Sequence, residues 1–534
     1  MEAKVMQKIK KLLEKTPNAL LCLLGAVVFL AGFYFLRSRT PLDEIWLPTA
    51  MNNDEVFYNR QVVSVITHGG PQGYFGYQEG TADIGQFSTW GPFLIWAYAI
   101  PGFLYGSSFN VVLWVNMLFI ALSIAGFARS AKLNWWQCII LCGTMFAVTQ
   151  PLSFCFNGAS EGLHYALTLV LMGGAIGMER TGKRGYFLLT AVACALETIV
   201  RPYTLLFWVF PLMVVWKNKR RRYACFALMA ASLGISLFAM AKLAAPYFSD
   251  GGMDFAGVQL LFQGHPIQAV VYELSRIWDY LKGAWKEIVP TLQGNTTYIG
   301  NGCVILLATT AATVACLIWD VRHGRRIRLK AASLGCSLII ALVLLGLYNI
   351  DPRHLMMMVM LQLAAVVKED SKPAVVYLPL LLLALLPMNF SRGTMPEKNE
   401  VMATQMEIVA EALDASRAED NSIDPWDNTL AYSYGDDVFH GYLYAVPDGM
   451  GIEFDKNSYL AYAYDDTVFH GYLYAVPDGM GIEFDKNSYL WDAENPIYSR
   501  YVMCGHGTRV EERLLAENWQ ELVSTEDLVI YKRS

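Results

Sequence analysis

Charged residues are scarce in this chain of 534 residues: they make up 16% of it, whereas 54% is hydrophobic and 13% aromatic. Soluble domains carry about 25% charged residues, so the deficit excludes an ordinary soluble protein. The ten cysteines form neither a disulfide framework nor a metal-ligand spacing, and only Cys504 lies in a polar stretch. No Ala-x-Ala site follows the basic start and the first apolar run, which predicts a retained signal anchor and not a cleaved signal peptide.

Hydrophobic runs near the length of a membrane crossing, each closed by a basic cluster, predict an α-helical polytopic membrane protein. We expect about eleven spans, at roughly 18–36, 109–128, 135–152, 164–178, 186–200, 203–216, 224–246, 302–320, 331–349, 354–367 and 374–390. A further apolar piece at 90–105 contains two prolines and is short for a crossing. We interpret it as a juxtamembrane or re-entrant piece; the alternative is an ordinary span in a topology that breaks the positive-inside rule.

Charge decides that interpretation. If 90–105 does not cross, six basic segments fall on one face, which the positive-inside rule makes cytoplasmic: 4–15, 129–132, 180–184, 217–222, 322–330 and 368–372. The N-terminal segment 1–17 is then cytoplasmic, and two long loops, 37–108 and 247–301, lie outside. The second loop carries an amphipathic stretch, 271–281, that we expect to be an interfacial helix. A bacterial plasma membrane is the simplest compartment, because no eukaryotic targeting signal is present.

The composition turns polar and acidic near Ser391, which predicts an extracytoplasmic α/β domain over 391–534 after a transmembrane catalytic domain over 18–390. We expect a helix at 399–417 and strands at 429–434 and 527–532. Residues 430–459 and 460–489 repeat with three differences. A packed domain cannot seat two near-identical copies in one set of contacts, so the repeat indicates a recent duplication or a sequence artefact and carries no functional information.

Two adjacent carboxylates, Asp54 and Glu55, lie where the first predicted span gives way to water. A helix start would also favour acids there. However, acids at the outer mouth of a bundle are functional candidates, and a Gly- and Tyr-rich loop that suits sugar binding follows at 69–78. Tyr58 and Tyr77 offer stacking surfaces for a sugar, although interfacial aromatics are often only belt residues.

A third acid, Glu161, falls on the same outer side after the third predicted span. Cations on this face are few: Arg201 follows the fifth span, and Arg353 with His354 follows the ninth. Arginine suits phosphate because its planar guanidinium donates bidentate hydrogen bonds and stays charged. Each arginine could instead extend to lipid headgroups. His265, in the second long loop, is a weaker candidate for substrate binding.

The order of these motifs resembles GT-C fold membrane glycosyltransferases, and in particular bacterial members of the family that contains protein O-mannosyltransferases and the aminoarabinose transferase of lipid A. Asp54-Glu55 matches the family's acidic first-loop motif, and Glu161 stands where the family places an acid. Asp351-Pro-Arg-His354 is similar to its Pro-Arg-Tyr segment, with His in place of Tyr. The resemblance covers roughly 15–390. Ser88-Thr-Trp-Gly-Pro92 replaces the usual His-Pro-Pro, which leaves the sugar and the acceptor open.

The resemblance implies an inverting transfer of a sugar from a polyprenyl-phosphate donor to a hydroxyl of a cell-surface glycan, lipid or protein, with no nucleic-acid partner. Asp54 would be the general base, Glu55 would orient the acceptor or support Asp54, and Arg201 and Arg353 would stabilise the leaving phosphate. No cofactor is required, although Asp54, Glu55 and Glu161 could together hold a divalent metal. The alternatives are a lipid or sugar transporter or flippase, and a non-catalytic cell-envelope scaffold.

Overall fold

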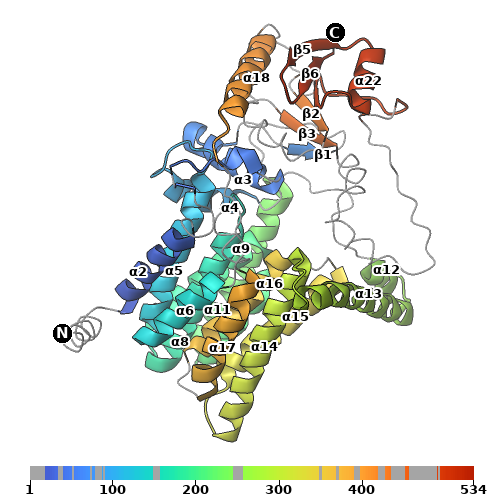
Figure 1. Cartoon of the computed structure of the whole chain (residues 1–534). Coiled ribbons are helices and arrows are strands. Elements are labelled where there is room, and N and C mark those ends of the chain that lie inside the picture. The colour runs from blue at the N-terminus through green and yellow to red at the C-terminus, as the bar shows by residue number, and fades with distance from the viewer. Residues whose placement is uncertain are drawn as a thin grey trace, which may run out of the picture.

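The computed structural model consists of an apolar helical bundle and a small mixed sheet formed mainly by the C-terminal region (Figure 1). It describes residues 18–33, 40–41, 43–50, 53–71, 75–77, 87, 91–147, 157–244, 256–347, 351–368, 372–389, 397–418, 427, 429–433, 451–455, 490 and 493–533. Of the two long loops, 37–108 and 247–301, it therefore describes the helical parts most fully.

Helix is present in every range that the sequence predicts as a span. The elements are α2 (Asn18–Phe33), α5 (Val111–Ala131), α6 (Trp135–Ala147), α8 (Glu161–Thr181), α9 (Arg184–Val200), η3 (Pro202–Trp208) with α10 (Val209–Val215), α11 (Lys219–Lys242), α14 (Tyr298–Arg322), α15 (Arg328–Leu347), α16 (Pro352–Val367) and α17 (Lys372–Asn389). Among the described residues, four helices are long and apolar enough to cross a membrane by length and composition, namely α5, α11, α14 and α15. The number of crossings stays a prediction.

Helix α16 forms the centre of the bundle. Nearly all of its side chains are buried, including the run Met356–Met360, because α6, α8, α14, α15 and α17 surround it. Glycines on α8 let its neighbours approach closely. A Cβ at Gly174 would lie 2.3 Å from the Thr190 Oγ1 atom of α9, and one at Gly177 would lie 2.7 Å from the ring of Tyr186. Small residues at helix contacts are the usual means of close packing between membrane helices.

Shorter elements lie at one end of the bundle, on the side nearest the sheet (Figure 1). They are η2 (Leu47–Ala50), α3 (Asn53–His68) and α4 (Pro92–Gly102). Helix α4, the predicted non-crossing piece, has 11 residues and is therefore about 16 Å long, too short for a hydrocarbon core of about 30 Å. Helices α12 (Ala256–Phe262) and α13 (Pro266–Leu292) come from the second long loop.

Helix α13 extends to one side of the bundle, and its apolar face is exposed (Figure 1). The exposed side chains include Ile267, Val271, Leu274, Trp278 and Trp285. This is the amphipathic character that the sequence predicts for an interfacial helix. Its C-terminal end packs tightly against α14, because a Cβ at Gly300 would lie 2.3 Å from the Glu287 carbonyl oxygen.

The sheet has six strands in the order β1-β3-β2-β4-β6-β5. These are β1 (Phe75–Tyr77), β2 (Thr429–Ser433), β3 (Gly451–Asp455), β4 (Tyr501–Cys504), β5 (Gln520–Ser524) and β6 (Val529–Lys532). Strands β1, β3, β2 and β4 pair in parallel, whereas β4, β6 and β5 pair antiparallel. Helices α18 (Glu400–Ala418) and α22 (Arg509–Ala516) accompany the sheet. Helix α18 and strands β2 and β6 lie within two residues of their predicted positions.

One strand of this sheet comes from the first long loop. Strand β1 is an edge strand and pairs with β3, with Tyr77 opposite Phe454. A second link joins the start of the C-terminal region to the same loop, since the Thr40 hydroxyl donates to Glu397 (3.1 Å) and the Lys398 amide donates to the Glu44 carbonyl oxygen (3.2 Å). Strands β2 and β3 hold the described residues of the first repeat copy, and the second copy, 460–489, lies outside the described residues.

Candidate functional site at the α3 end of the bundle

Two X-Pro junctions build the site. A residue that precedes proline is driven out of the helical region, and proline is favoured at the first position of a helix. Accordingly, α9 ends at Val200, Arg201 is extended (φ −137°, ψ 103°) and Pro202 starts η3. In the same way, Asp351 is extended (φ −115°, ψ 125°) before α16 starts at Pro352. Each junction places a charged side chain at the end of a buried helix.

Arg201 is 3% exposed and holds the first half of the site together. Its Nη2 atom donates to the Ser160 hydroxyl (2.8 Å) and to Glu161 Oε1 (3.1 Å), and its Nη1 atom donates to the Tyr203 hydroxyl (3.0 Å). Buried charges are tolerated only when they are paired and hydrogen-bonded. Glu161 is 4% exposed, and its Oε2 atom has no hydrogen-bond partner among the described residues. One carboxylate oxygen is therefore available for a ligand.

The second half of the site lies at the start of α16. Asp351 accepts hydrogen bonds from Arg353 Nε (2.8 Å), from the Arg353 amide (2.9 Å) and from the Tyr298 hydroxyl (3.3 Å). These bonds fix the guanidinium of Arg353, whose side chain is 26% exposed. The two halves meet where the Tyr203 hydroxyl lies 3.5 Å from His354 Nδ1, with the rings edge to face.

The electrostatics match this geometry. Burial alone would lower the pKa of Arg201, but the nearby oxygens of Tyr203, Glu161 and Tyr58 hold it well above its ordinary value. Burial alone would raise the pKa of Asp351, but Arg353 and His354 hold it below its ordinary value. Both groups therefore remain charged at neutral pH.

Helix α3 lies beside this cluster. Tyr58 is buried in one apolar cluster with Leu163 of α8 and Val200 of α9, which flank Glu161 and Arg201 in sequence. Glu55 is 4% exposed. The side chain of Asp54 lies outside the described residues, but its backbone is in α3, one helical turn before Tyr58 and on the same helix face. The start of α3 is thus next to the ends of α8 and α9.

The structure thus gathers Tyr58, Glu161, Arg201, Arg353 and His354 at one end of the bundle. It does not bring the other two predicted substrate-binding residues to them. Tyr77 lies in edge strand β1, and its side chain is not among the described ones. His265 is the exposed residue before α13, and no described interaction links its side chain to the cluster.

Sequence reasoning missed a second buried pair, which lies one helical turn further along α8 and α9 from Glu161 and Arg201. His164 Nδ1 lies 2.7 Å from Glu197 Oε2, and the Thr168 hydroxyl lies 3.4 Å from Glu197 Oε1. Both titratable side chains are buried. The signal was a glutamate within an apolar run, which is a functional candidate in its own right. It also missed Ser160 and Tyr203, because hydroxyl residues carry no distinguishing pattern.

A metal site is not defined by these residues. Within the part of the chain that the structure describes, no three His, Cys, Asp or Glu side chains gather as a ligand set. The two described carboxylates of the cluster, Glu161 and Asp351, each form an ion pair with an arginine. Participation of a divalent metal stays a prediction.

No family model and no curated protein matches the sequence. Several solved structures are similar to the chain, among them the following two. The oligosaccharyltransferase of Archaeoglobus fulgidus in the apo form has a TM-score of 0.51 and 12% identity over 91% of this chain and 69% of its own. ArnT from Cupriavidus metallidurans bound to undecaprenyl phosphate has a TM-score of 0.49 and 11% identity, over 96% of this chain and 97% of its own. The first similarity confirms the predicted GT-C fold, and with the apolar helices it identifies a membrane protein.

Proposed function

We propose that the protein is an inverting glycosyltransferase that moves a sugar from a polyprenyl-phosphate donor to an acceptor hydroxyl at the α3 end of the bundle. The observation that carries the proposal is the gathering of Glu161, Arg201, Arg353 and His354 where the apolar helices end. A lipid-borne phosphate needs a cation for its head beside an apolar environment for its chain, and Arg353, partly exposed at the end of the apolar helix α16, meets the first requirement. The shared fold with an oligosaccharyltransferase supports the same class of reaction.

Arg353 is the proposed contact for the donor phosphate. Its guanidinium is partly exposed, and Asp351 accepts one hydrogen bond from its Nε atom and another from the Arg353 amide, so little ordering is needed when an anion binds. The leaving group is already a stable phosphate anion and needs no general acid. Arg201 is buried and engaged by three oxygens, so its role is to add positive potential and to hold Glu161 in place.

The acceptor hydroxyl does need a base. Asp54 is the proposed general base, and Glu55 the residue that supports it. The assignment is supported by Tyr58, one helical turn after Asp54 in α3, which shares an apolar cluster with sequence neighbours of Glu161 and Arg201. The Glu161 Oε2 atom, which has no hydrogen-bond partner among the described residues, can accept from a sugar hydroxyl. Tyr58 is buried and acts as packing that sets the distance between α3 and Arg201. Direct attack from the face opposite the phosphate inverts the anomeric carbon.

The test is sugar transfer by the purified full chain in detergent, with radiolabelled polyprenyl-phosphate sugars supplied one at a time and a cell-envelope fraction as acceptor. Asp54→Asn should lower transfer by roughly 10²- to 10⁴-fold, the usual contribution of a positioned base. Asp43→Asn is the matched control, since Asp43 is an exposed aspartate of the same loop and should be neutral. Near-normal transfer by Asp54→Asn would remove Asp54 from its role. A wild-type chain that consumes no donor in detergent but moves lipid-linked sugar across vesicles would instead be a transporter.

A further inference from the structure

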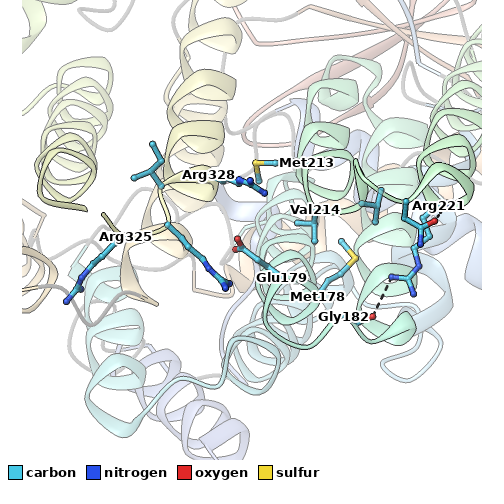
Figure 2. A pocket seen from close by; sticks show the side chains of 12 residues that line it. Met178, Glu179, Gly182, Met213, Val214, Arg221, Arg325 and Arg328 are labelled. Carbon is cyan, nitrogen blue, oxygen red and sulfur yellow. Dashed lines mark hydrogen bonds between the residues drawn. The ribbon is translucent and has the colours of Figure 1, made fainter. Parts of the chain in front are cut away.

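A basic cavity lies at the opposite end of the bundle from Glu161. It encloses ≈ 610 Å³ and is formed by the C-terminal end of α8, the junction of α10 and α11, and the loop between α14 and α15 (Figure 2). Helix α8 has 21 residues, so its two ends are about 30 Å apart. The cavity is therefore separate from the proposed transfer site, on the face that the sequence predicts to be cytoplasmic.

The charge of the cavity is strongly one-sided. Four arginines line it, Arg221, Arg325, Arg326 and Arg328, against one carboxylate, Glu179. Arg221 Nη1 donates a long hydrogen bond to the Gly182 carbonyl oxygen (3.5 Å; Figure 2). The side chains of the other three arginines make no hydrogen bond or ion pair with any residue that the structure describes. Their donors are thus available to an anion.

Interactions between the end of α14 and the start of α15 hold the segment that carries Arg325, Arg326 and Arg328 in place. Lys330 Nζ donates to Asp320 Oδ2 at 2.6 Å, and both side chains are fully buried. The Asp320 carbonyl oxygen accepts from the amides of Arg325 (2.8 Å) and His323 (3.2 Å). The ring of His323 in turn stacks on the ring of Trp319, with 4.0 Å between the ring centroids. The arginines are therefore presented from an ordered turn.

The remaining wall is mostly apolar. Gly182 and Asn218 contribute to it beside five apolar side chains: Met178, Met213, Val214, Val215 and Ile327. The positive-inside rule accounts for arginines on this face, but it does not account for their placement around a cavity with an apolar wall. Guanidinium donors beside apolar side chains match an amphiphile that bears a phosphate, and basic pockets between helices on this side of a membrane bind anionic headgroups. From this combination, we infer that the cavity binds the phosphate headgroup of an anionic phospholipid.

The test is binding of short-chain phosphatidylglycerol to the full chain in a neutral detergent, measured by native mass spectrometry. Phosphatidylcholine and inorganic phosphate are the comparison ligands. The triple variant Arg325→Gln, Arg326→Gln, Arg328→Gln should bind phosphatidylglycerol on the order of 100-fold more weakly. The matched control removes the same charge from exposed arginines of the same face outside the cavity, in Arg180→Gln, Arg184→Gln, Arg220→Gln, and should change binding less than about threefold.

A third variant, Met213→Trp, fills the cavity without changing its charge and should also abolish selective binding. The proposal stands if phosphatidylglycerol is preferred over phosphatidylcholine and if both cavity variants lose that preference. Equal losses in the two charge variants would overturn it, because the whole basic face would then be responsible. Equal binding of inorganic phosphate, without a contribution from the lipid chain, would assign the cavity to a free anion and overturn the lipid inference. Unchanged binding by Met213→Trp would place the lipid elsewhere.

Discussion

Arg201 and Glu161 form a buried ion pair whose coupling can be measured directly. Each side chain is at most 5% exposed, and the Nη2–Oε1 distance is 3.1 Å. Arg201→Met leaves the Glu161 carboxylate without its counter-ion and removes three side-chain hydrogen bonds. Removal of one partner of a buried pair costs about 3–5 kcal/mol, because the charge that stays behind is uncompensated. We therefore expect the free energy of unfolding of Arg201→Met to fall by that amount.

The double variant separates structure from function. Replacement of both charges by methionine leaves no buried charge, and such replacements are often neutral, so Arg201→Met with Glu161→Met should lose only about 1 kcal/mol. Because Glu161→Met alone should likewise cost about 3–5 kcal/mol, the double-mutant cycle then gives a coupling energy of roughly 5–9 kcal/mol. Sugar transfer should nevertheless stay at least 100-fold below wild type, because the site has lost an arginine and the Glu161 oxygens.

The measurement is equilibrium unfolding in mixed micelles titrated with SDS, followed by tryptophan fluorescence, together with the transfer assay. The control pair is Asp320 with Lys330, which is equally buried and has a shorter separation of 2.6 Å at the other end of the bundle. Its double replacement should leave transfer unchanged. Additive single-variant losses would show that Arg201 and Glu161 are not coupled. A stable double variant with normal transfer would show that the pair is only structural.

Three further outcomes are expected. Arg353→Ala should raise the apparent donor KM roughly tenfold or more, because a charge-assisted hydrogen bond to the donor is lost, and should leave the acceptor KM unchanged. An unchanged donor KM would refute the phosphate role of Arg353. Gly162→Ala should destabilise the fold by about 1–3 kcal/mol in thermal unfolding, because its Cβ would lie 2.3 Å from Asn116 Oδ1, whereas Gly126→Ala has open space and should be neutral. The pKa of Asp351 lies below its ordinary value of 3.8, so the charged carboxylate stabilises the folded state above that pH. The difference in the free energy of unfolding between wild type and Asp351→Asn should therefore stay constant from pH 7 to 4 and shrink only below pH 4.

Much of the fold was predictable because hydrophobic length and charge are properties of single segments. Each expected span contains helix, and α4 is short because two prolines interrupt an apolar run of limited length. The sheet was less predictable. Strand β1 has only three residues, and its pairing with β3 joins segments more than 370 positions apart, a separation that local patterns do not encode.

The site was predictable only in part, because most of its contacts join residues that are far apart in the sequence. Arg201 and Arg353 could be singled out because proline fixes the backbone beside each of them. The bonds from Arg201 to Ser160 and Glu161, 41 and 40 positions away, depend on how α8 and α9 pack. The pairing of His164 with Glu197 likewise required two helices in register.

The tandem repeat and strand β3 together have a consequence for the stability of the sheet. The five residues of β3, Gly451–Asp455, recur letter for letter at 481–485. The chain therefore carries a second copy of the sequence of the strand that joins the first long loop to the C-terminal region. Removal of 460–489 deletes none of the described strands. We therefore expect deletion of 460–489 to leave the six-stranded sheet and its stability in place.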